Sequence, residues 1–246
     1  MTYAPFTVTG TQRKGRWLIT CDHAANTVPD FVAGGSLGLP ESDMQRHIAY
    51  DPGAAGVARA LGTLLDSPVI ESNFSRLVID PNRGEDDPTL LMKLYDGTII
   101  PANRHAGPEE REARLNACHR PYHAEIARLA ARRDDTVYLA IHSFTPQLRG
   151  RPKRPWHVGV LFAEDERLSA PLIDRLRAEP DLCIGANEPY GGHLPGDAVD
   201  RHAIAPGRLN TLIELRNDLI ASAEQQARWA ERLAPILQAA LADTAS

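Results

Sequence analysis

Four short apolar runs of the sequence end in histidines, carboxylates or arginines. These polar residues lie far apart in the chain, between residues 22 and 218. The segments that follow the runs are Asp22-His23-Ala24-Ala25-Asn26, Asp80-Pro81-Asn82-Arg83, His142-Ser143-Phe144-Thr145 and Glu214-Leu215-Arg216-Asn217-Asp218. In open α/β sheets, sites lie beyond the carboxyl ends of the strands. If the four runs are strands of one sheet, two histidines, a glutamate and two arginines are expected at the same edge.

These side chains suit hydrolysis assisted by a metal ion. Two neutral imidazoles, here those of His23 and His142, together with an oxygen ligand hold a catalytic zinc and leave one position open for water. The ion lowers the pKa of the water and polarises the scissile carbonyl. The carboxylate of Glu214 can then take the proton of the water and return it to the leaving amine. Arginine guanidinium groups bind a substrate carboxylate through two parallel hydrogen bonds.

The elements that must position these residues alternate along the chain. Compact apolar runs predict buried strands at Trp17–Cys21, Thr136–His142, His157–Phe162 and Thr211–Arg216, and a strand pair or one bent strand at Pro68–Ser72 and Leu77–Asp80. Helices are predicted over 41–66 with a break near Asp51, 108–133 with a kink or break at Pro121, 169–177, and 221–241 with a kink near Pro235. Strands that alternate with helices predict a largely parallel sheet covered on both faces.

Six segments carry a resemblance to a known family. They are LITCDHAANTVP, HIAYDPGAAGVARAL, SNFSRLVIDPNR, AIHSFTP, HVGVLF and IELRNDLI, and they occur in order between Trp17 and Ile220. Together they resemble the N-formylglutamate amidohydrolase family, which is similar in fold to zinc carboxypeptidases and aspartoacylases. The resemblance implies an α/β fold, a three-layer α/β/α sandwich with a central mixed, mostly parallel sheet, formed by a single domain over residues 1–246.

The resemblance also implies a metal site. In the wider zinc-peptidase pattern, an HxxE pair and a distant histidine hold the ion, and His23 and His142 match the two histidines. The glutamate position falls on Asn26, which would bind through its oxygen. Asp51 and Asp22 are the alternative sources of a carboxylate ligand. The expected cofactor is Zn²⁺ or another divalent metal ion.

Further residues take roles from the same resemblance. Asn82 and Arg83 match the residues that grip the substrate's carboxylate, and Arg76 matches the arginine that polarises the scissile carbonyl. Glu214 resembles the general base, and Arg216 follows it in the ExRND motif as a further substrate-binding residue. His202 is expected to line the pocket. The expected partner is a small-molecule N-acyl amino acid.

Composition excludes other classes of partner. The net charge is −5, with acidic and basic residues interspersed, which argues against a nucleic-acid or anionic-membrane surface. The N-terminal residues contain no apolar run long enough for a signal peptide, and the chain has no stretch of 18 apolar residues. The three cysteines form no CxxC pair. We therefore expect a cytoplasmic protein.

Two alternative functions remain open at this point. Asn26 in place of a glutamate favours a carboxylate-binding relative that has lost the metal and is not an enzyme. A metallopeptidase acting on glutamyl or short peptide bonds would use the same residues. His119 and His123 are four residues apart, as in some metal sites, but Pro121 lies between them and we expect a surface or packing role.

Overall fold

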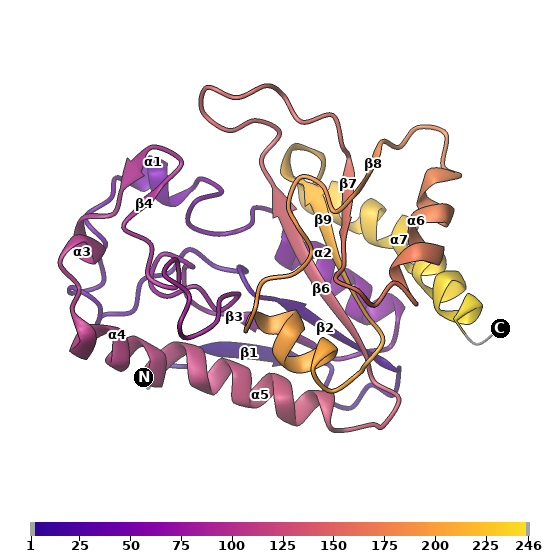
Figure 1. Cartoon of the computed structure of the whole chain (residues 1–246), viewed down its shortest axis with the longest axis horizontal. Helices are drawn as coiled ribbons and strands as arrows, with labels where there is room; N and C mark the ends of the chain where they lie inside the picture. The colour runs from indigo at the N-terminus through magenta and orange to yellow at the C-terminus, as the bar shows by residue number, and fades with distance from the viewer. Residues whose placement is uncertain (1–2, 245–246) are drawn as a thin grey trace.

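A mixed β-sheet forms the centre of the structure, which is a computed structural model describing residues 3–244 (Figure 1). Among these residues the sheet has seven strands in the order β1-β3-β2-β6-β9-β7-β8. The strands are β1 (Phe6–Thr9), β2 (Trp17–Cys21), β3 (Val69–Ser72), β6 (Val137–Phe144), β7 (Val158–Leu161), β8 (Ile184–Ala186) and β9 (Asn210–Arg216). β1 runs antiparallel to β3 and β7 antiparallel to β9, while the other neighbours are parallel. The predicted mixed, mostly parallel sheet is therefore confirmed.

Helices and one small hairpin complete the chain. The helices are α1 (Glu41–Met44), α2 (Ala54–Leu64), α3 (Pro101–Arg104), α4 (Pro108–Arg114), η1 (Leu115–His119), α5 (Arg120–Ala130), α6 (Ser169–Arg177), η2 (Asp200–Ile204), η3 (Asn217–Leu219) and α7 (Ala223–Asp243). The hairpin pairs β4 (Leu94–Tyr95) with β5 (Thr98–Ile99). Within the described residues no helix is both long enough and apolar enough to cross a membrane.

Helices cover both faces of the sheet, as the predicted three-layer α/β/α sandwich requires. Figure 1 shows α6 and α7 to one side of the sheet and α5 along the other. One apolar cluster packs α2, α6 and α7 against β2, β6 and β9, and a second packs α5 and η2 against the opposite face. α7 buries Ala230, Leu233, Leu237 and Ala240, a helical spacing, and Ser222 caps its first turn through a capping box with Gln225.

Some elements differ from the sequence-based expectation. The prediction of a strand at Leu77–Asp80 is wrong: these residues form turns and a coil, and the three apolar ones are buried in a third cluster under the loops. A short apolar run indicates burial, but it forms a strand only where a neighbouring strand hydrogen-bonds to it, and otherwise it is equally consistent with a buried turn. The helix predicted at 108–133 divides into α4, η1 and α5, and Pro121 lies in the first turn of α5, directly after the π-helical turn of η1.

The strand order determines where a site can form. β2, β6 and β9 are parallel neighbours, so their carboxyl ends share one edge of the sheet. In the register of β6 and β9, His142 lies opposite Glu214. The break between α1 and α2 brings Asp51 to this edge, where its backbone N–H donates to the carbonyl of His23.

Candidate active site

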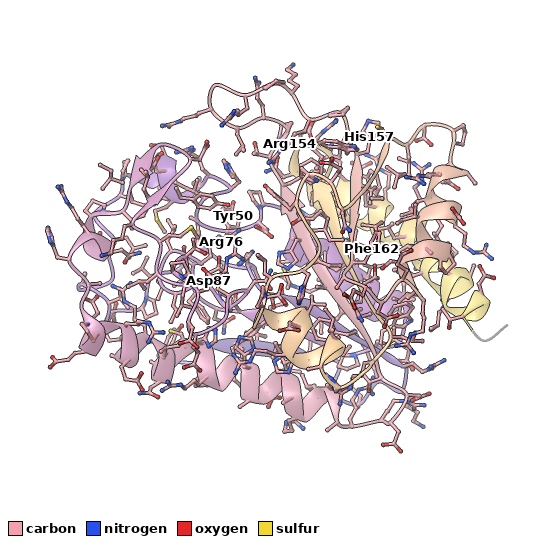
Figure 2. The ribbon with its side chains drawn as sticks, viewed as in Figure 1. Tyr50, Arg76, Asp87, Arg154, His157 and Phe162 are labelled. Carbon is pink, nitrogen blue, oxygen red and sulfur yellow. The ribbon has the colours of Figure 1, made fainter. Side chains whose placement is uncertain are left out.

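A cleft of about 480 Å³ lies at the carboxyl ends of β2, β6 and β9. Seven of its polar lining residues are His23, Asp51, Arg76, Asn82, Arg83, His142 and Glu214. They come from five separate segments of the chain. Figure 2 shows Arg76 between the sheet and the loops that precede α4. The structure thus brings both predicted histidines, Glu214 and the predicted substrate-binding pair into one cavity.

A buried carboxylate faces the outer nitrogen of each histidine. His23 Nε2 lies 2.7 Å from Asp80 Oδ1, and His142 Nε2 lies 3.3 Å from Asp22 Oδ2. An ionised carboxylate only accepts hydrogen bonds, so His23 Nε2 donates to Asp80, whereas His142 Nε2 faces Asp22 without a hydrogen bond among the described residues. A neutral ring with its proton on Nε2 keeps a lone pair on Nδ1. Asp22 is held in turn by the hydroxyl of Tyr122, which donates to Oδ1 at 2.7 Å.

The inner nitrogens of both histidines face the same oxygen of Asp51. Asp51 Oδ2 lies 3.3 Å from His23 Nδ1 and 2.9 Å from His142 Nδ1. One ligand atom from each of the three residues lies within 4.8 Å of the others, and all three residues are buried. Three lone-pair atoms that converge away from water require a cation between them, either a proton or a metal ion. The donor set, two imidazoles and a carboxylate, matches a catalytic zinc site.

The electrostatics around this cluster favour a cation. Burial by itself lowers the pKa of His142, but hydrogen bonds and charges from Asp22 and Asp51 raise that pKa well above its ordinary value. Burial acts to raise the pKa of Asp51, yet the two histidines hold it well below its usual range. The carboxylate of Asp51 is therefore ionised and available as a ligand.

Glu214 also lies in this cleft, and the pKa of its own side chain is unusual. Its side chain is buried, and its Oε2 has no hydrogen-bond partner among residues 3–244. Burial raises its pKa to about 7, and the charge of Asp51 acts in the same direction. A carboxylate with a pKa near neutrality can both accept and return a proton under physiological conditions.

The arginines of the cleft have different partners. Arg76 donates to Asp80 Oδ2 through Nε and Nη2, at 3.2 and 2.8 Å, and its Nη1 lies 3.6 Å from Asp51 Oδ1. Arg83 makes no ion pair among the described residues; it donates to the hydroxyl of Thr89 and to the carbonyl of Asn82. Among residues 3–244, Arg83 is therefore the arginine of the cleft that forms no ion pair with a carboxylate.

Three residues expected at the site have other contacts. The amide of Asn26 donates to the Met44 carbonyl at 2.9 Å, so of the three candidates for the third ligand Asp51 is the one that contacts both histidines. Arg216 does not line the cleft; it extends past the end of β9 to Asp218 and to the backbone carbonyls of residues 154–156. His202 is buried in η2, where its ring stacks on His123, and does not line the cleft.

Sequence reasoning missed the residues that hold the site in place. His119 Nε2 lies 3.0 Å from the carbonyl of Arg83, and His123 Nε2 lies 2.9 Å from the carbonyl of Pro81. Both rings are buried, so of the surface or packing roles expected for them, packing is the one that the structure shows. Their spacing of four residues was the available signal, because it places both on one face of a helix. That face is turned to the loop that carries Asn82.

Several known proteins are similar to this chain in sequence or in fold. A family model described as N-formylglutamate amidohydrolase matches residues 15–221. The chain is 27% identical over 213 residues to an N-formylglutamate deformylase of Pseudomonas putida, covering 78% of this chain and 75% of that protein. The crystal structure of a gene product from Agrobacterium tumefaciens is 34% identical and superposes with a TM-score of 0.91, covering 98% of this chain and 96% of the other. An N-formylglutamate amidohydrolase from Ralstonia eutropha is 20% identical, with a TM-score of 0.75 and 97% coverage of both chains.

Proposed function

Because the chain belongs to the N-formylglutamate amidohydrolase family, whose members hydrolyse carbon–nitrogen bonds, we propose that it cleaves the amide of an N-acyl amino acid with the help of a divalent metal ion. N-formylglutamate is the first substrate to test, since the Pseudomonas putida relative is described as its deformylase. Zn²⁺ is the first metal to test, because its preferred ligands are those of the cleft.

One observation carries the proposal. The Nδ1 atoms of His23 and His142 face one oxygen of Asp51, while a carboxylate faces each Nε2. Histidines that bind a metal almost always donate their other ring N–H to a carboxylate, a carbonyl or water, which fixes the tautomer and the ring orientation. We assign His23, His142 and Asp51 as the metal ligands, with Asp80 and Asp22 as the residues that orient the two rings.

The proposed hydrolysis uses the residues of the cleft in sequence. A divalent cation at these ligands supplies Lewis acidity, which makes water a better nucleophile and the amide carbonyl a better electrophile. Glu214 takes a proton from the attacking water, whose oxygen forms a bond to the carbonyl carbon. Glu214 then delivers that proton to the amide nitrogen as the carbon–nitrogen bond breaks. The products are the carboxylic acid of the acyl group and the free amino acid.

Two arginines have distinct proposed roles. Arg83, with the amide of Asn82, binds the substrate's carboxylate, which is consistent with a cleft cation that has no carboxylate partner within the described part of the chain. Arg76 lies beside Asp51, and we assign it to stabilise negative charge that develops on the carbonyl oxygen.

The test combines metal analysis with product detection. The purified protein is stripped of metal, reloaded with Zn²⁺ and incubated with N-formylglutamate, and release of formate and glutamate is measured. We expect about one zinc per chain and hydrolysis that depends on it. Bound zinc without hydrolysis of any N-acyl amino acid or glutamyl peptide would contradict an enzyme, and cleavage of glutamyl peptides alone would favour a metallopeptidase.

A further inference from the structure

The connection between β6 and β7 carries a dense group of positive charges that the proposed hydrolysis does not use. Residues 147–154, with the sequence QLRGRPKR, contain four basic residues and no acidic one, in a chain whose net charge is −5. Arg149, Arg151 and Lys153 are exposed, and Arg154 is half-buried. None of the four forms an ion pair with a carboxylate within residues 3–244. We call residues 147–154 the basic arm.

The strand directions place the basic arm at the edge of the sheet that carries the cleft. β6 is parallel to β9, and its last residue, Phe144, pairs with Arg216. β7 is antiparallel to β9 and begins with Val158, which pairs with Leu215. Both ends of the connection therefore lie next to Glu214. Figure 1 shows the connection projecting past the ends of both strands.

The basic arm contacts two segments that line the cleft. The backbone N–H of Arg149 donates to Asp96 Oδ1 at 3.2 Å, and Asp96 follows Tyr95, a cleft residue of the β4–β5 hairpin. Arg154 Nη1 donates to the hydroxyl of Tyr190 at 3.0 Å, and its guanidinium lies 4.9 Å from the centre of that ring (Figure 2). Tyr190 lines the cleft as well. The arm is thus joined to the rim of the cleft at both of its ends.

Hydrogen bonds within the arm give it a defined shape. The side chain of Gln147 donates to the carbonyl of Arg151 at 2.7 Å, and the backbone N–H of Arg151 donates to the carbonyl of Leu148 at 3.1 Å. The backbone N–H of Arg154 donates to the carbonyl of Pro146 at 2.9 Å and closes the base. The exposed cations are therefore carried by a folded segment, which keeps their charges beside the cleft.

From this placement we infer that the basic arm recruits anionic substrates to the cleft and strengthens their binding with each negative charge that they carry. The inference rests on the proposed function, because the recruited molecule is the substrate of that site. The remainder of the chain is more negative than the whole and repels anions. A local group of cations reverses this field at the cleft and raises the concentration of an anionic ligand there.

Screening determines which step of the reaction the arm affects. Charges exposed to water act over about 8 Å at physiological salt, so the arm acts on a molecule at the mouth of the cleft. Rim charges of this kind change association and its salt dependence. The arm should therefore change KM and kcat/KM and leave kcat unaltered, because it does not contact the reacting atoms.

The test removes two charges from the arm. In Arg151→Gln/Lys153→Gln the two replaced side chains are exposed and make no side-chain hydrogen bond within the described part of the chain, so the fold should be retained. Lys14→Gln/Arg177→Gln is the matched control. It also removes one lysine and one arginine that are exposed, from the segment before β2 and from the end of α6.

Three substrates of similar shape vary the charge. Zinc-loaded proteins are assayed with N-formyl-L-glutamine, N-formyl-L-glutamate and N-formyl-γ-carboxy-L-glutamate, which carry one, two and three negative charges. At low salt we expect the arm variant to lose kcat/KM by about twofold, fourfold and eightfold in that order. The control variant should stay close to the unaltered protein. A loss that is the same for all three substrates, or equal losses in the two variants, would overturn the inference.

Salt provides an independent readout of the same effect. The screening length falls from about 30 Å at 0.01 M salt to about 3 Å at 1 M. The difference between the arm variant and the unaltered protein should therefore disappear at high salt. A difference that persists there would show a structural effect of the substitutions and contradict recruitment by charge.

Binding measurements separate the inference from the proposed chemistry. Calorimetry on zinc-loaded Glu214→Gln protein, with and without the arm substitutions, gives the Kd of the same three compounds without turnover. If the unaltered protein hydrolyses none of them but the arm substitutions weaken binding more for each added charge, recruitment stands and the proposed chemistry fails. If the weakening does not depend on substrate charge, recruitment fails regardless of turnover.

Discussion

At the scale of single residues, Asp51 connects the parts of the candidate site. Its Oδ2 contacts both histidines and accepts a hydrogen bond from the backbone N–H of Ser143, while its Oδ1 faces Arg76. A carboxylate is a far better zinc ligand than a neutral amide. In the proposed site the departure at Asn26 does not require weaker metal binding, because Asp51 brings a carboxylate from another segment to both histidines.

Replacement of Asp51 tests this assignment directly. Asp51→Asn keeps the shape but removes the charge, and we expect zinc affinity to fall at least a hundredfold, since even residues that only orient the ligands contribute about 10- to 100-fold. Asn26→Ala is the matched control and should retain zinc. Competitive titration against a chromogenic chelator measures both. Loss of zinc in the Asn26 variant, with retention in the Asp51 variant, would reverse the assignment.

Glu214 distinguishes catalysis from mere binding. Glu214→Gln cannot accept a proton at neutral pH, so turnover should fall on the order of a hundredfold or more while zinc content and melting temperature are retained. If Glu214 instead has a structural role, the substitution should lower the melting temperature and leave the rate per folded molecule nearly unchanged. Zinc content, melting temperature and turnover measured on one preparation decide between the two.

The raised pKa of Glu214 also predicts a pH dependence of the rate. Burial raises this pKa to about 7, and only the ionised form can accept the proton of water. As pH falls below about 7 the carboxylate becomes protonated, so kcat/KM should drop close to tenfold per pH unit. Initial rates between pH 5 and pH 8.5 measure the acidic limb. The residual activity of Glu214→Gln should lack it.

The proposed role of Arg83 also depends on a single residue, because it requires the planar shape of the guanidinium group. Arg83→Lys keeps the charge but loses the paired N–H donors that bind a carboxylate bidentately. We expect kcat/KM on the best acyl amino acid to fall roughly 10- to 100-fold, or a few kcal/mol in transition-state binding. Steady-state kinetics with the two proteins measure the change, and unchanged efficiency would contradict the assignment.

At the scale of elements, the helical segment from α4 to α5 acts as a support for the substrate-binding loop. His119 and His123 bond to carbonyls of residues 83 and 81, on either side of Asn82. Burial lowers the pKa of His123 well below its usual value, with the nearby histidines acting in the same direction, so the ring is neutral. Because its Nε2 donates to a carbonyl, its Nδ1 accepts from His202 Nε2, at 2.8 Å. His202 therefore affects the site only indirectly: it donates to His123, which in turn donates to the carbonyl of Pro81 in the substrate-binding loop.

Replacement of His123 tests this support. His123→Leu fills a similar volume but cannot donate to the Pro81 carbonyl, so the loop loses an anchor and KM should rise about tenfold or more, with a smaller effect on kcat. His123→Gln can still donate through its amide and should restore much of the loss. Equal changes in KM and kcat for both variants, or a fall in melting temperature alone, would argue for a purely structural role.

At the scale of the whole molecule, folding brings three carboxylates into a nearly water-free cluster. Asp22, Asp51 and Asp80 are each at most 3% exposed, and their positive partners are Arg76 and the histidines. Buried ions are costly unless they are paired, so the fold depends on its cations. A metal ion that binds only the folded state adds to stability by mass action.

Removal of the metal should therefore change stability as well as activity. With zinc at about a thousand times its Kd, binding contributes about 4 kcal/mol, which for a chain of this size corresponds to roughly 10 °C in melting temperature. Chelation should abolish turnover and lower the melting temperature by that order, and added Zn²⁺ should restore both. Calorimetric scans with and without chelator measure this, and a melting temperature indifferent to zinc would contradict the ligand assignment.

Several features followed from the sequence alone because they depend on local pattern. Trp17–Cys21 is a strand as predicted, and β6, β7 and β9 lie where apolar runs predicted them, since a strand covered on both faces is largely apolar. α6 has the predicted limits, Ser169–Arg177. His23 after β2, His142 near the end of β6 and Glu214 near the end of β9 meet at one edge because parallel neighbours end on the same side.

Other features depended on contacts that no local pattern contains. Asp51 and His23 are 28 residues apart in the sequence. The turn between α1 and α2 brings the carboxylate of Asp51 to the two histidines, a position that the sequence pattern assigned to Asn26. Arg216 is two residues beyond Glu214, yet its side chain points away from the cleft. β9 ends at Arg216, and its guanidinium donates hydrogen bonds to backbone carbonyls there. The sequence by itself determined which strands carry polar residues to the edge of the sheet. The tertiary structure decided which of those side chains converge, because the position of a side chain beyond the end of a strand depends on how distant segments pack around it.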